Sequence, residues 1–249
     1  MSGHSKWSTI KHKKGAADAK RGKIFSKLAK AITSAARQGG GSPEMNIKLQ
    51  YAIDKAKSEN MPKDNIERAI LKGTGELSGD AVLYESLYEG YGPNGVAVLV
   101  EILTDNKNRT AAEIRKIFEI SGGNLGESGC VSWMFQKKGL ISVNISEVDE
   151  DKLMVLVLDA GCEDLQTIDG MYQINCDTKD FNNVKKMLQD EGVKIELAEI
   201  SWVTTSTFIE LDEAKCRSIV SLMEKLENHD DVQNVYANFT LPKDVLAKL

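Results

Sequence analysis

Residues 137–203 read KKGLISVNISEVDEDKLMVLVLDAGCEDLQTIDGMYQINCDTKDFNNVKKMLQDEGVKIELAEISWV. Strand-like runs at 140–145, 164–169, 171–176 and 194–202 alternate with helical periodicity at 148–160 and 181–190. The resulting order, β-α-β-β-α-β, is that of a ferredoxin-like sandwich. One segment stays open, because Leu153–Leu158 is apolar throughout and fits either a buried helix or a buried strand.

The residues on either side of this stretch predict a second set of elements. Before it come strands at 82–89 and 96–103, a helix at 109–120 and a strand at 131–135. After it come a strand at 208–211, a helix that begins at Asp212 and a strand at 232–239. Neither half closes a sandwich alone. The segment 137–203 is therefore predicted to be inserted into a discontinuous α/β domain of residues 80–136 plus 204–249.

Residues 1–79 predict a basic helical domain. An amphipathic helix at 16–38 ends at three glycines, and a second helix is expected to begin with Ser42 as its cap and Pro43 in its first turn. A third helix follows Pro62 and ends at Gly73. The predicted fold class is thus α+β: an N-terminal three-helix domain followed by two ferredoxin-like α/β sandwich domains, one inserted in the other.

Charge is distributed very unevenly along the chain. The first 37 residues hold ten Lys and Arg against one acid, Asp18, whereas the whole chain has a net charge of −5. Through Gly75 there are 16 basic and 6 acidic residues; from Glu76 onward there are 16 basic and 31 acidic ones. A cationic segment in an acidic protein indicates a polyanionic partner, and nucleic acid is the obvious one.

Phosphate contacts from an N-terminal arm and from one face of the first helix are the predicted binding mode. Lysine predominates over arginine there, which favours recognition of backbone or shape over bidentate readout of bases. Two aromatic rings lie among the cations and could stack on a base or a sugar. The prediction requires that the acidic remainder of the chain does not itself engage these lysines. The candidate nucleic-acid-binding residues are Lys6, Trp7, Lys11, His12, Lys13, Lys14, Lys20, Arg21, Lys23, Lys27 and Lys30.

Two polar segments allow a ligand site as an alternative to a structural role. The string Thr104–Thr110 ends a predicted strand and begins a helix, so Asn108 could cap that helix or belong to a small-molecule site. The stretch 122–129 is rich in glycine, but it follows a helix and lacks the Gly-Lys-Ser/Thr ending of a phosphate loop. A loop that needs open backbone angles is the preferred interpretation of this second segment.

The remaining features argue against several function classes. Four cysteines without CxxC spacing and three histidines predict no metal site and no disulfide framework, which suits a reducing cytoplasm. No apolar run is long enough for a membrane helix. No nucleophile–base set is suggested, so the chain is predicted not to be an enzyme, to have no catalytic residue and to require no cofactor.

Five long motifs closely resemble the YebC/PmpR family: GHSKW (3–7), RGKIFSK (21–27), NMPKDNIERAI (60–70), YEGYGP (88–93) and TDNKNRT (104–110). The resemblance runs the full length and implies an N-terminal helical domain with two ferredoxin-like domains, one inserted in the other. Members of that family are described as probable cytoplasmic transcriptional regulators that bind DNA. Related bacterial proteins and the mitochondrial translational activator of cytochrome oxidase act at the ribosome and relieve stalled synthesis. The family implies no catalytic residue and no cofactor.

Three hypotheses follow. The chain is a DNA-binding transcriptional regulator, or a ribosome-associated translation factor that contacts rRNA or tRNA, or a ligand sensor or enzyme. A lysine-rich helix binds DNA and RNA phosphates alike, so the residues do not rank the first two hypotheses. The third predicts that a small molecule raises the melting temperature, although no obligatory small molecule is expected.

Overall fold

The computed structural model describes residues 18–77, 82–168, 170–206, 209–211 and 213–240. Within these residues the fold is α+β, with seven α-helices, two four-stranded antiparallel sheets and a short two-stranded sheet. The chain divides into two compact units: residues 134–206 form one, and the rest of the described chain forms the other. This agrees with the predicted fold class, whereas the exact domain ranges 1–79, 80–136 plus 204–249, and 137–203 remain predictions.

Three helices form the N-terminal region: α2 (Asp18–Gly39), α3 (Ile47–Ser58) and α4 (Lys63–Thr74). Their apolar faces share one core, in which Ile32 and Leu49 are fully buried. Helices α2 and α4 approach very closely at Gly73. A Cβ placed there would lie 2.6 Å from both the Cβ of Ala36 and the carbonyl oxygen of Thr33. Gly73 is therefore needed for the packing of these two helices, because no larger residue fits.

The predicted start of the second helix is wrong. Ser42 does not cap it; residues 43–45 form a turn and the helix begins at Ile47. Asn46 is the cap, and its buried side chain accepts from Leu49 N while donating to the carbonyl oxygens of Ala35 and Gly40. One amide thus satisfies groups at the end of α2 and at the start of α3, which Ser42 has too few donors to do.

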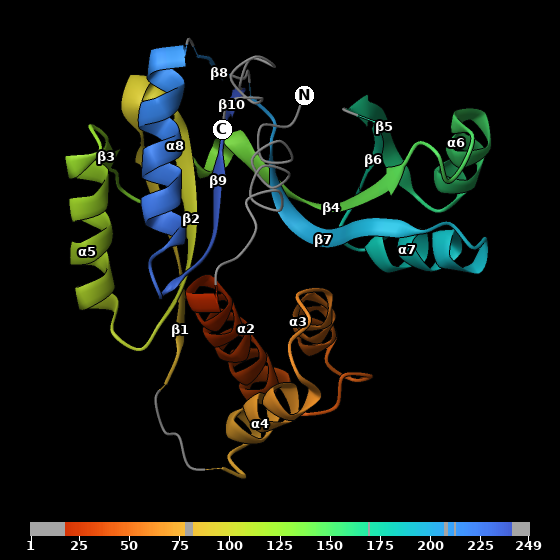
Figure 1. Ribbon diagram of the computed structural model, residues 1–249, viewed down its shortest axis with the longest axis horizontal. Helices are drawn as coiled ribbons and strands as arrows, with labels where there is room; N and C mark the ends of the chain where they lie inside the picture. The colour runs from red at the N-terminus through yellow and green to blue at the C-terminus, as the bar shows by residue number, and fades with distance from the viewer. Residues whose placement is uncertain (1–17, 78–81, 169, 207–208, 212, 241–249) are drawn as a thin grey trace. The chain divides into compact units, whose positions relative to one another are not determined.

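The first sheet has the strand order β3-β1-β2-β9. Figure 1 shows α5 and α8 side by side along this sheet, and they enclose a core that contains Ile114, Phe118, Ile219 and Leu222. The strand pair β1–β2 is joined through the turn at 92–96, as the hairpin prediction requires. The elements are β1 (Tyr84–Tyr91), β2 (Ala97–Thr104), α5 (Lys107–Ile120), β3 (Asn124–Leu125), β8 (Ile209–Glu210), α8 (Glu213–Glu227), β9 (Val232–Ala237) and β10 (Phe239–Thr240). Two short 3-10 turns also occur, Pro93–Gly95 and Ser132–Met134.

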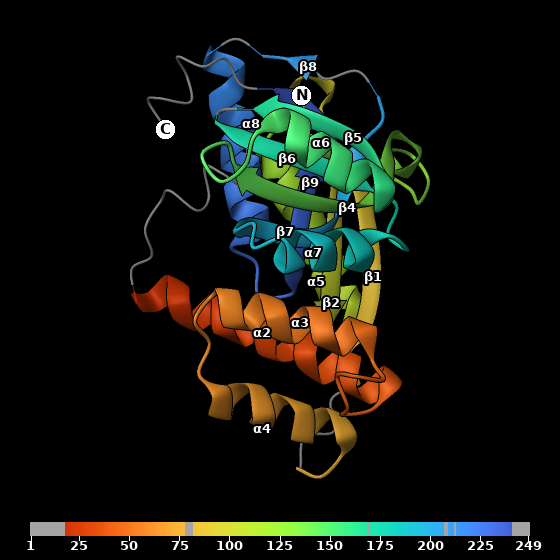
Figure 2. The ribbon, with the colours of Figure 1, turned by 90° about the vertical axis from the view of Figure 1, so that its right-hand side faces the viewer.

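The compact unit 134–206 has the predicted order β-α-β-β-α-β and the sheet order β5-β6-β4-β7. Figure 2 shows α6 and α7 on the same face of that sheet. The ambiguous apolar run is helical and belongs to α6, while the separate strands predicted at 131–135 and 140–145 are replaced by one long strand, β4. The elements are β4 (Phe135–Asn144), α6 (Glu150–Asp159), β5 (Cys162–Ile168), β6 (Met171–Cys176), α7 (Phe181–Asp190) and β7 (Ile195–Thr204).

Candidate nucleic-acid interface and the Asp231 cluster

Seven of the eleven predicted binding residues are not described. Six lie in the arm, outside the described residues, and the seventh is in α2, where its side chain is not described. Arg21 is exposed near the start of α2. The structure therefore gives the surroundings of only Lys23, Lys27 and Lys30 in detail. The undescribed positions are Lys6, Trp7, Lys11, His12, Lys13 and Lys14 of the arm, and Lys20 of α2.

The three described lysines form a stripe along α2, which we call the lysine stripe (Lys23, Lys27 and Lys30). Their spacing of four and three residues places them on one face of the helix. Their ammonium groups contact the chain immediately after α8, in the segment 227–231. Lys27 donates to Glu227 O, and Lys23 donates to Asn228 O at 3.3 Å. The lysine stripe is thus engaged within the chain, and for these three residues the condition that the acidic remainder leaves the cations unengaged is not met.

Lys30 forms a close ion pair with Asp231. Its Nζ lies 2.8 Å from Asp231 Oδ1 and 3.3 Å from Asp230 O. Further along the same face of α2, Ser34 and Gln38 donate to Glu85 of β1 at 3.1 and 3.0 Å. One face of α2 therefore packs in the three-helix core, and the opposite face contacts the α/β elements of the same unit.

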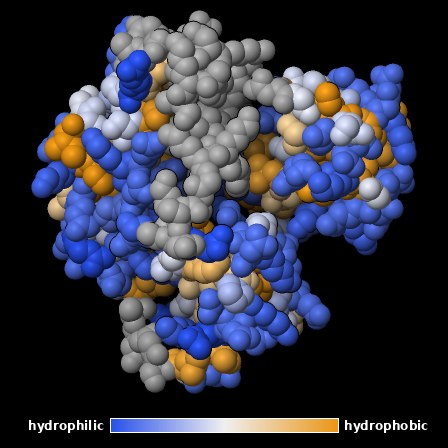
Figure 3. Space-filling view, in the orientation of Figure 1, coloured by the Kyte–Doolittle hydropathy of each residue, from blue (hydrophilic) through white to orange (hydrophobic). Residues whose placement is uncertain are grey.

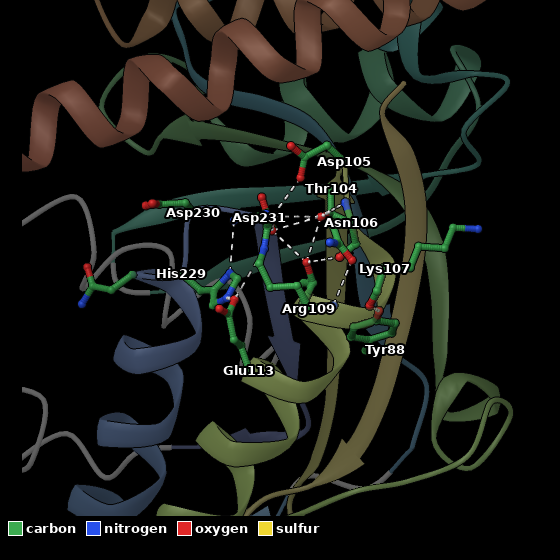
Figure 4. A network of polar contacts seen from close by, with 12 residues as sticks. Tyr88, Thr104, Asp105, Asn106, Lys107, Arg109, Glu113, His229, Asp230 and Asp231 are labelled. Atoms are coloured by element: carbon green, nitrogen blue, oxygen red, sulfur yellow. Dashed lines mark hydrogen bonds and ion pairs between the residues drawn. The ribbon is translucent and has the colours of Figure 1, made fainter. Parts of the chain in front are cut away.

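Asp231 is the central acceptor of a polar cluster at the end of β2 (Figure 4). Its Oδ2 accepts from Thr104 Oγ1 at 3.0 Å, Thr110 Oγ1 at 2.8 Å and Arg109 at 2.8 Å, while Oδ1 accepts from Lys30. The Asp231 side chain is only 4% exposed, so it needs these partners to remain ionised. Burial alone would raise the pKa of Asp231, but the hydrogen bonds from Lys30, Arg109 and Thr110 outweigh it and hold that pKa well below its usual range.

The motif predicted to cap a helix or form a ligand site contributes most of this cluster. Asn106, not Asn108, is the cap of α5, because its side chain accepts from Arg109 N at 3.1 Å. Arg109 also bonds to Asp105 at 2.9 Å, and the hydrogen bonds to Asp231 and then to Asp105 raise the pKa of its guanidinium. The motif thus serves structure first, by binding Asp231 and starting α5.

His229 and Glu113 extend the cluster toward solvent. His229 Nδ1 accepts from Asp231 N at 3.1 Å, so its other ring nitrogen, Nε2, is the one that donates to Glu113, at 2.9 Å. Figure 4 shows Asp231 turned into the cluster and Asp230 turned away from it. An open groove of about 700 Å³ borders these residues. Its charged lining has both signs: Lys23, Lys30, Arg109, Lys116, Asp105, Glu113, Asp230 and Asp231.

The glycine-rich stretch is a loop held by one carboxylate. Glu89 of β1 is 4% exposed and accepts from the backbone N–H groups of Gly129, Val131 and Ser132 at 2.7 to 2.9 Å. Gly122 and Gly129 have φ values of 77° and 91°, as expected for a loop that needs open angles. Burial acts to raise the pKa of Glu89, but these backbone hydrogen bonds lower it below its ordinary value.

The described residues form neither a candidate metal site nor a membrane-spanning helix. No group of three or more His, Cys, Asp and Glu side chains among the described residues could hold a metal ion. No helix among them is both long enough and apolar enough to span a bilayer. On the face shown in Figure 3 the described residues are mainly hydrophilic, with apolar side chains in small groups.

The sequence predictions missed Asp231, Glu89, Glu85 and His229. The YEGYGP motif contains Glu89, but the motif alone assigns this carboxylate no role. Asp231 carries no local signal beyond lying beside another acid after a helix, because its partners are distant in sequence.

Two family models match this chain. Residues 5–76 match the model described as the TACO1/YebC protein N-terminal domain, and residues 83–239 match that of the TACO1/YebC second and third domain. The chain is 56% identical over 249 residues to a probable transcriptional regulatory protein of Syntrophus aciditrophicus, covering 100% of this chain and 99% of that one. It is 55% identical over 250 residues to a probable transcriptional regulatory protein of Geobacter sulfurreducens, with 100% of both chains covered. A crystal structure of a conserved hypothetical protein from Aquifex aeolicus is 48% identical, with a TM-score of 0.82 over 94% of this chain and 96% of that chain.

Proposed function

Since this chain belongs to the TACO1/YebC family, we propose that it is a nucleic-acid-binding regulatory protein, and first of all a DNA-binding transcriptional regulator. The names of its relatives support the regulatory part of this proposal. The main support for nucleic-acid binding is the charge of the first 37 residues, which hold ten cationic residues and one acidic residue. Such a segment gains affinity for any phosphate backbone through counterion release.

The arm and the first turn of α2 are the proposed contact surface. The lysine stripe beyond them already binds carboxylate and carbonyl oxygens within the chain, so its chemistry suits oxyanions. The residues proposed to contact phosphate at this surface are Lys6, Lys11, Lys13, Lys14, Lys20 and Arg21, with Trp7 and His12 stacking beside them. Metal, cofactor and catalytic residues have no part in this proposal, and the cytoplasm is its proposed location.

Charge reversal at Lys11, Lys13 and Lys14 tests the proposal directly. None of the three belongs to the lysine stripe, so the contacts that hold α2 keep their residues. Binding of the full chain to a 20-base-pair duplex would be measured across salt concentrations. With about six phosphate contacts we expect a log–log salt slope of roughly −5 for the natural chain, and about half of that for the triple variant.

A matched triple variant controls for net charge. Lys152, Lys179 and Lys186 are exposed in the compact unit 134–206, and their reversal to Glu changes the net charge by the same amount. We expect this control to lose much less affinity than the arm variant. Equal losses in the two triple variants, or no binding of the natural chain to DNA or RNA in dilute buffer, would refute the proposal.

The alternative function is that of a ribosome-associated, RNA-binding translation factor that relieves stalled synthesis. The predominance of Lys over Arg in the first 37 residues, eight against two, favours backbone recognition and so suits rRNA or tRNA as well as DNA. Sedimentation of cell lysate with and without high salt separates the two functions. A ribosome-associated factor travels with ribosomes at low salt and binds structured RNA more tightly than duplex DNA of equal phosphate count.

A further inference from the structure

The lysine stripe faces an array of oxygen atoms that resembles a phosphate backbone in chemistry. Helix α8 ends at Glu227, where its last carbonyl groups have no partner within the helix and carry the negative end of the helix dipole. The ammonium groups of the stripe lie on these and the following carbonyls, of Glu227, Asn228 and Asp230. The carboxylates of Asp230 and Asp231 add negative charge to this array, although Arg109 also binds Asp231.

The contact between the lysine stripe and the segment 227–231 is strong at Lys30 and weak at Lys23. At the inner end, Lys30 is about two-thirds buried and lies 2.8 Å from the buried Asp231. At the outer end, Lys23 and Asp230 lie 3.5 Å apart with side chains 55% and 74% exposed. Water and salt screen the outer pair more strongly than the inner one, in which the carboxylate is buried and Lys30 is one-third exposed. The outer pair is therefore the one that a competing anion can replace.

A second attachment keeps α2 in place when the outer pair separates. Glu85 of β1 accepts from Ser34 and Gln38 of α2 and pairs with Lys48 of α3. Burial acts to raise the pKa of Glu85, but the hydrogen bond and charge of Lys48 lower it below its ordinary value, so this attachment is ionic as well. Exchange at Lys23 thus does not require the three-helix region to leave the α/β elements.

We propose that the segment 227–231 is a built-in competitor of nucleic acid for the lysine stripe. In the free protein Asp230 forms an ion pair with Lys23. In the complex a phosphate group replaces Asp230 as the partner of Lys23. Lys30 stays bound to Asp231 in both states and positions α2 without contacting phosphate. This inference rests on the proposed function, and it separates the three stripe lysines into an exchangeable outer group and a fixed inner one.

Substitution of Asp230 by Asn removes the competing charge while keeping the size of the side chain. We expect the full-length D230N protein to bind a 20-base-pair duplex and a structured RNA about two- to fivefold more tightly, the range of a surface ion pair. Asp159→Asn is the control, because Asp159 is exposed in the other compact unit and its loss changes the net charge equally. It should change affinity less.

A double-mutant cycle with Lys23→Gln separates local competition from the general field of the protein. If Asp230 acts through Lys23, D230N gains affinity in the natural background and gains little in K23Q. K23Q should also lower the salt slope by about 0.9 on duplex DNA, while Lys30→Gln leaves the slope unchanged.

The outcomes distinguish this inference from the proposed function. Normal binding by the natural chain with no gain from D230N, or an equal gain in both backgrounds, overturns the competitor alone. A loss of slope from K30Q equal to that from K23Q overturns the assigned role of Lys30. If neither the natural chain nor D230N binds DNA or RNA in dilute buffer, the proposed function and the competitor fall together.

Discussion

Lys30 and Asp231, 201 positions apart in the chain, form an ion pair with 2.8 Å between Nζ and Oδ1. The pair joins α2 to the residue that precedes β9, and the same carboxylate binds Thr104, Arg109 and Thr110. The segments matched by two separate family models are therefore linked through one buried side chain. A buried acceptor with four charged or hydroxyl donors has large effects when it is changed.

Replacing Asp231 by Asn should destabilise the protein by about 2 kcal/mol. The change removes the charge that Lys30 and Arg109 need and places an amide donor among existing donors. This loss is at the low end for a buried ion pair, because the Lys30 and Arg109 side chains are 33% and 44% exposed and can regain water. Urea denaturation followed by circular dichroism measures the loss. D230N is the matched control and should cost less than about 0.5 kcal/mol; equal losses would contradict the central role of Asp231.

The Asp231 carboxylate should also make the free energy of unfolding depend on pH in the acid range. The pKa of Asp231 is lowered in the folded chain, so the unfolded chain binds more protons as the pH falls. Its contribution is complete above the unfolded pKa and is lost as the pH falls through the folded one. The free energy of unfolding should therefore decrease below about pH 5. In D231N that decrease should be shallower, since only other carboxylates with a lowered pKa, such as Glu89, still contribute. Parallel pH curves for D231N and the natural chain would refute this account.

Sequence periodicity predicted the helices well where one face is apolar and the other charged. Helix α2 and helix α7 are examples, since their buried residues recur at helical spacing. The run in α6 could not be assigned, because Val155 and Leu158 are exposed although apolar, so the sequence does not show which face is buried. The start of α3 was misplaced because the capping residue is chosen by contacts with α2, which lie outside the local window.

Of the residues in this site, the sequence predicts the lysines but not the groups that accept from them. A lysine stripe on α2 can be recognised from its spacing, but its acceptors lie about 200 positions later. Nothing local distinguishes Asp231, which is buried, from Asp230, which is 74% exposed. That difference arises from the packing of β2, α5 and β9 and cannot be obtained from the neighbouring residues alone.

Replacing Glu89 by Gln should loosen the loop at 126–132. The carboxylate accepts three backbone N–H groups, and an amide can accept fewer and would direct its own N–H toward another donor. We expect a loss of about 2 kcal/mol and faster hydrogen exchange at the amides of Gly129, Val131 and Ser132. Glu127→Gln, exposed in the same loop, is the control and should leave exchange unchanged. Unaltered exchange in E89Q would show that the loop is held by other contacts.

Two Gly→Ala changes in the three-helix region should have opposite signs. At Gly73 a methyl group meets Ala36 and the backbone of Thr33 at 2.6 Å, so α4 must move away from α2, at a cost of about 1 to 3 kcal/mol. At Gly22, within α2, no described atom outside the adjoining turns of the helix lies within 4 Å of the new methyl group. Alanine also lowers the entropy of the unfolded chain, which should stabilise the protein by up to about 1 kcal/mol. Urea midpoints measure both. If G73A were as stable as the natural chain, the close approach of the two helices would not be a requirement of the fold.

Because G22A lies one residue from the start of the lysine stripe, its nucleic-acid affinity should also be measured. An unchanged salt slope together with a raised midpoint would show that α2 can be made more stable without altering its phosphate contacts.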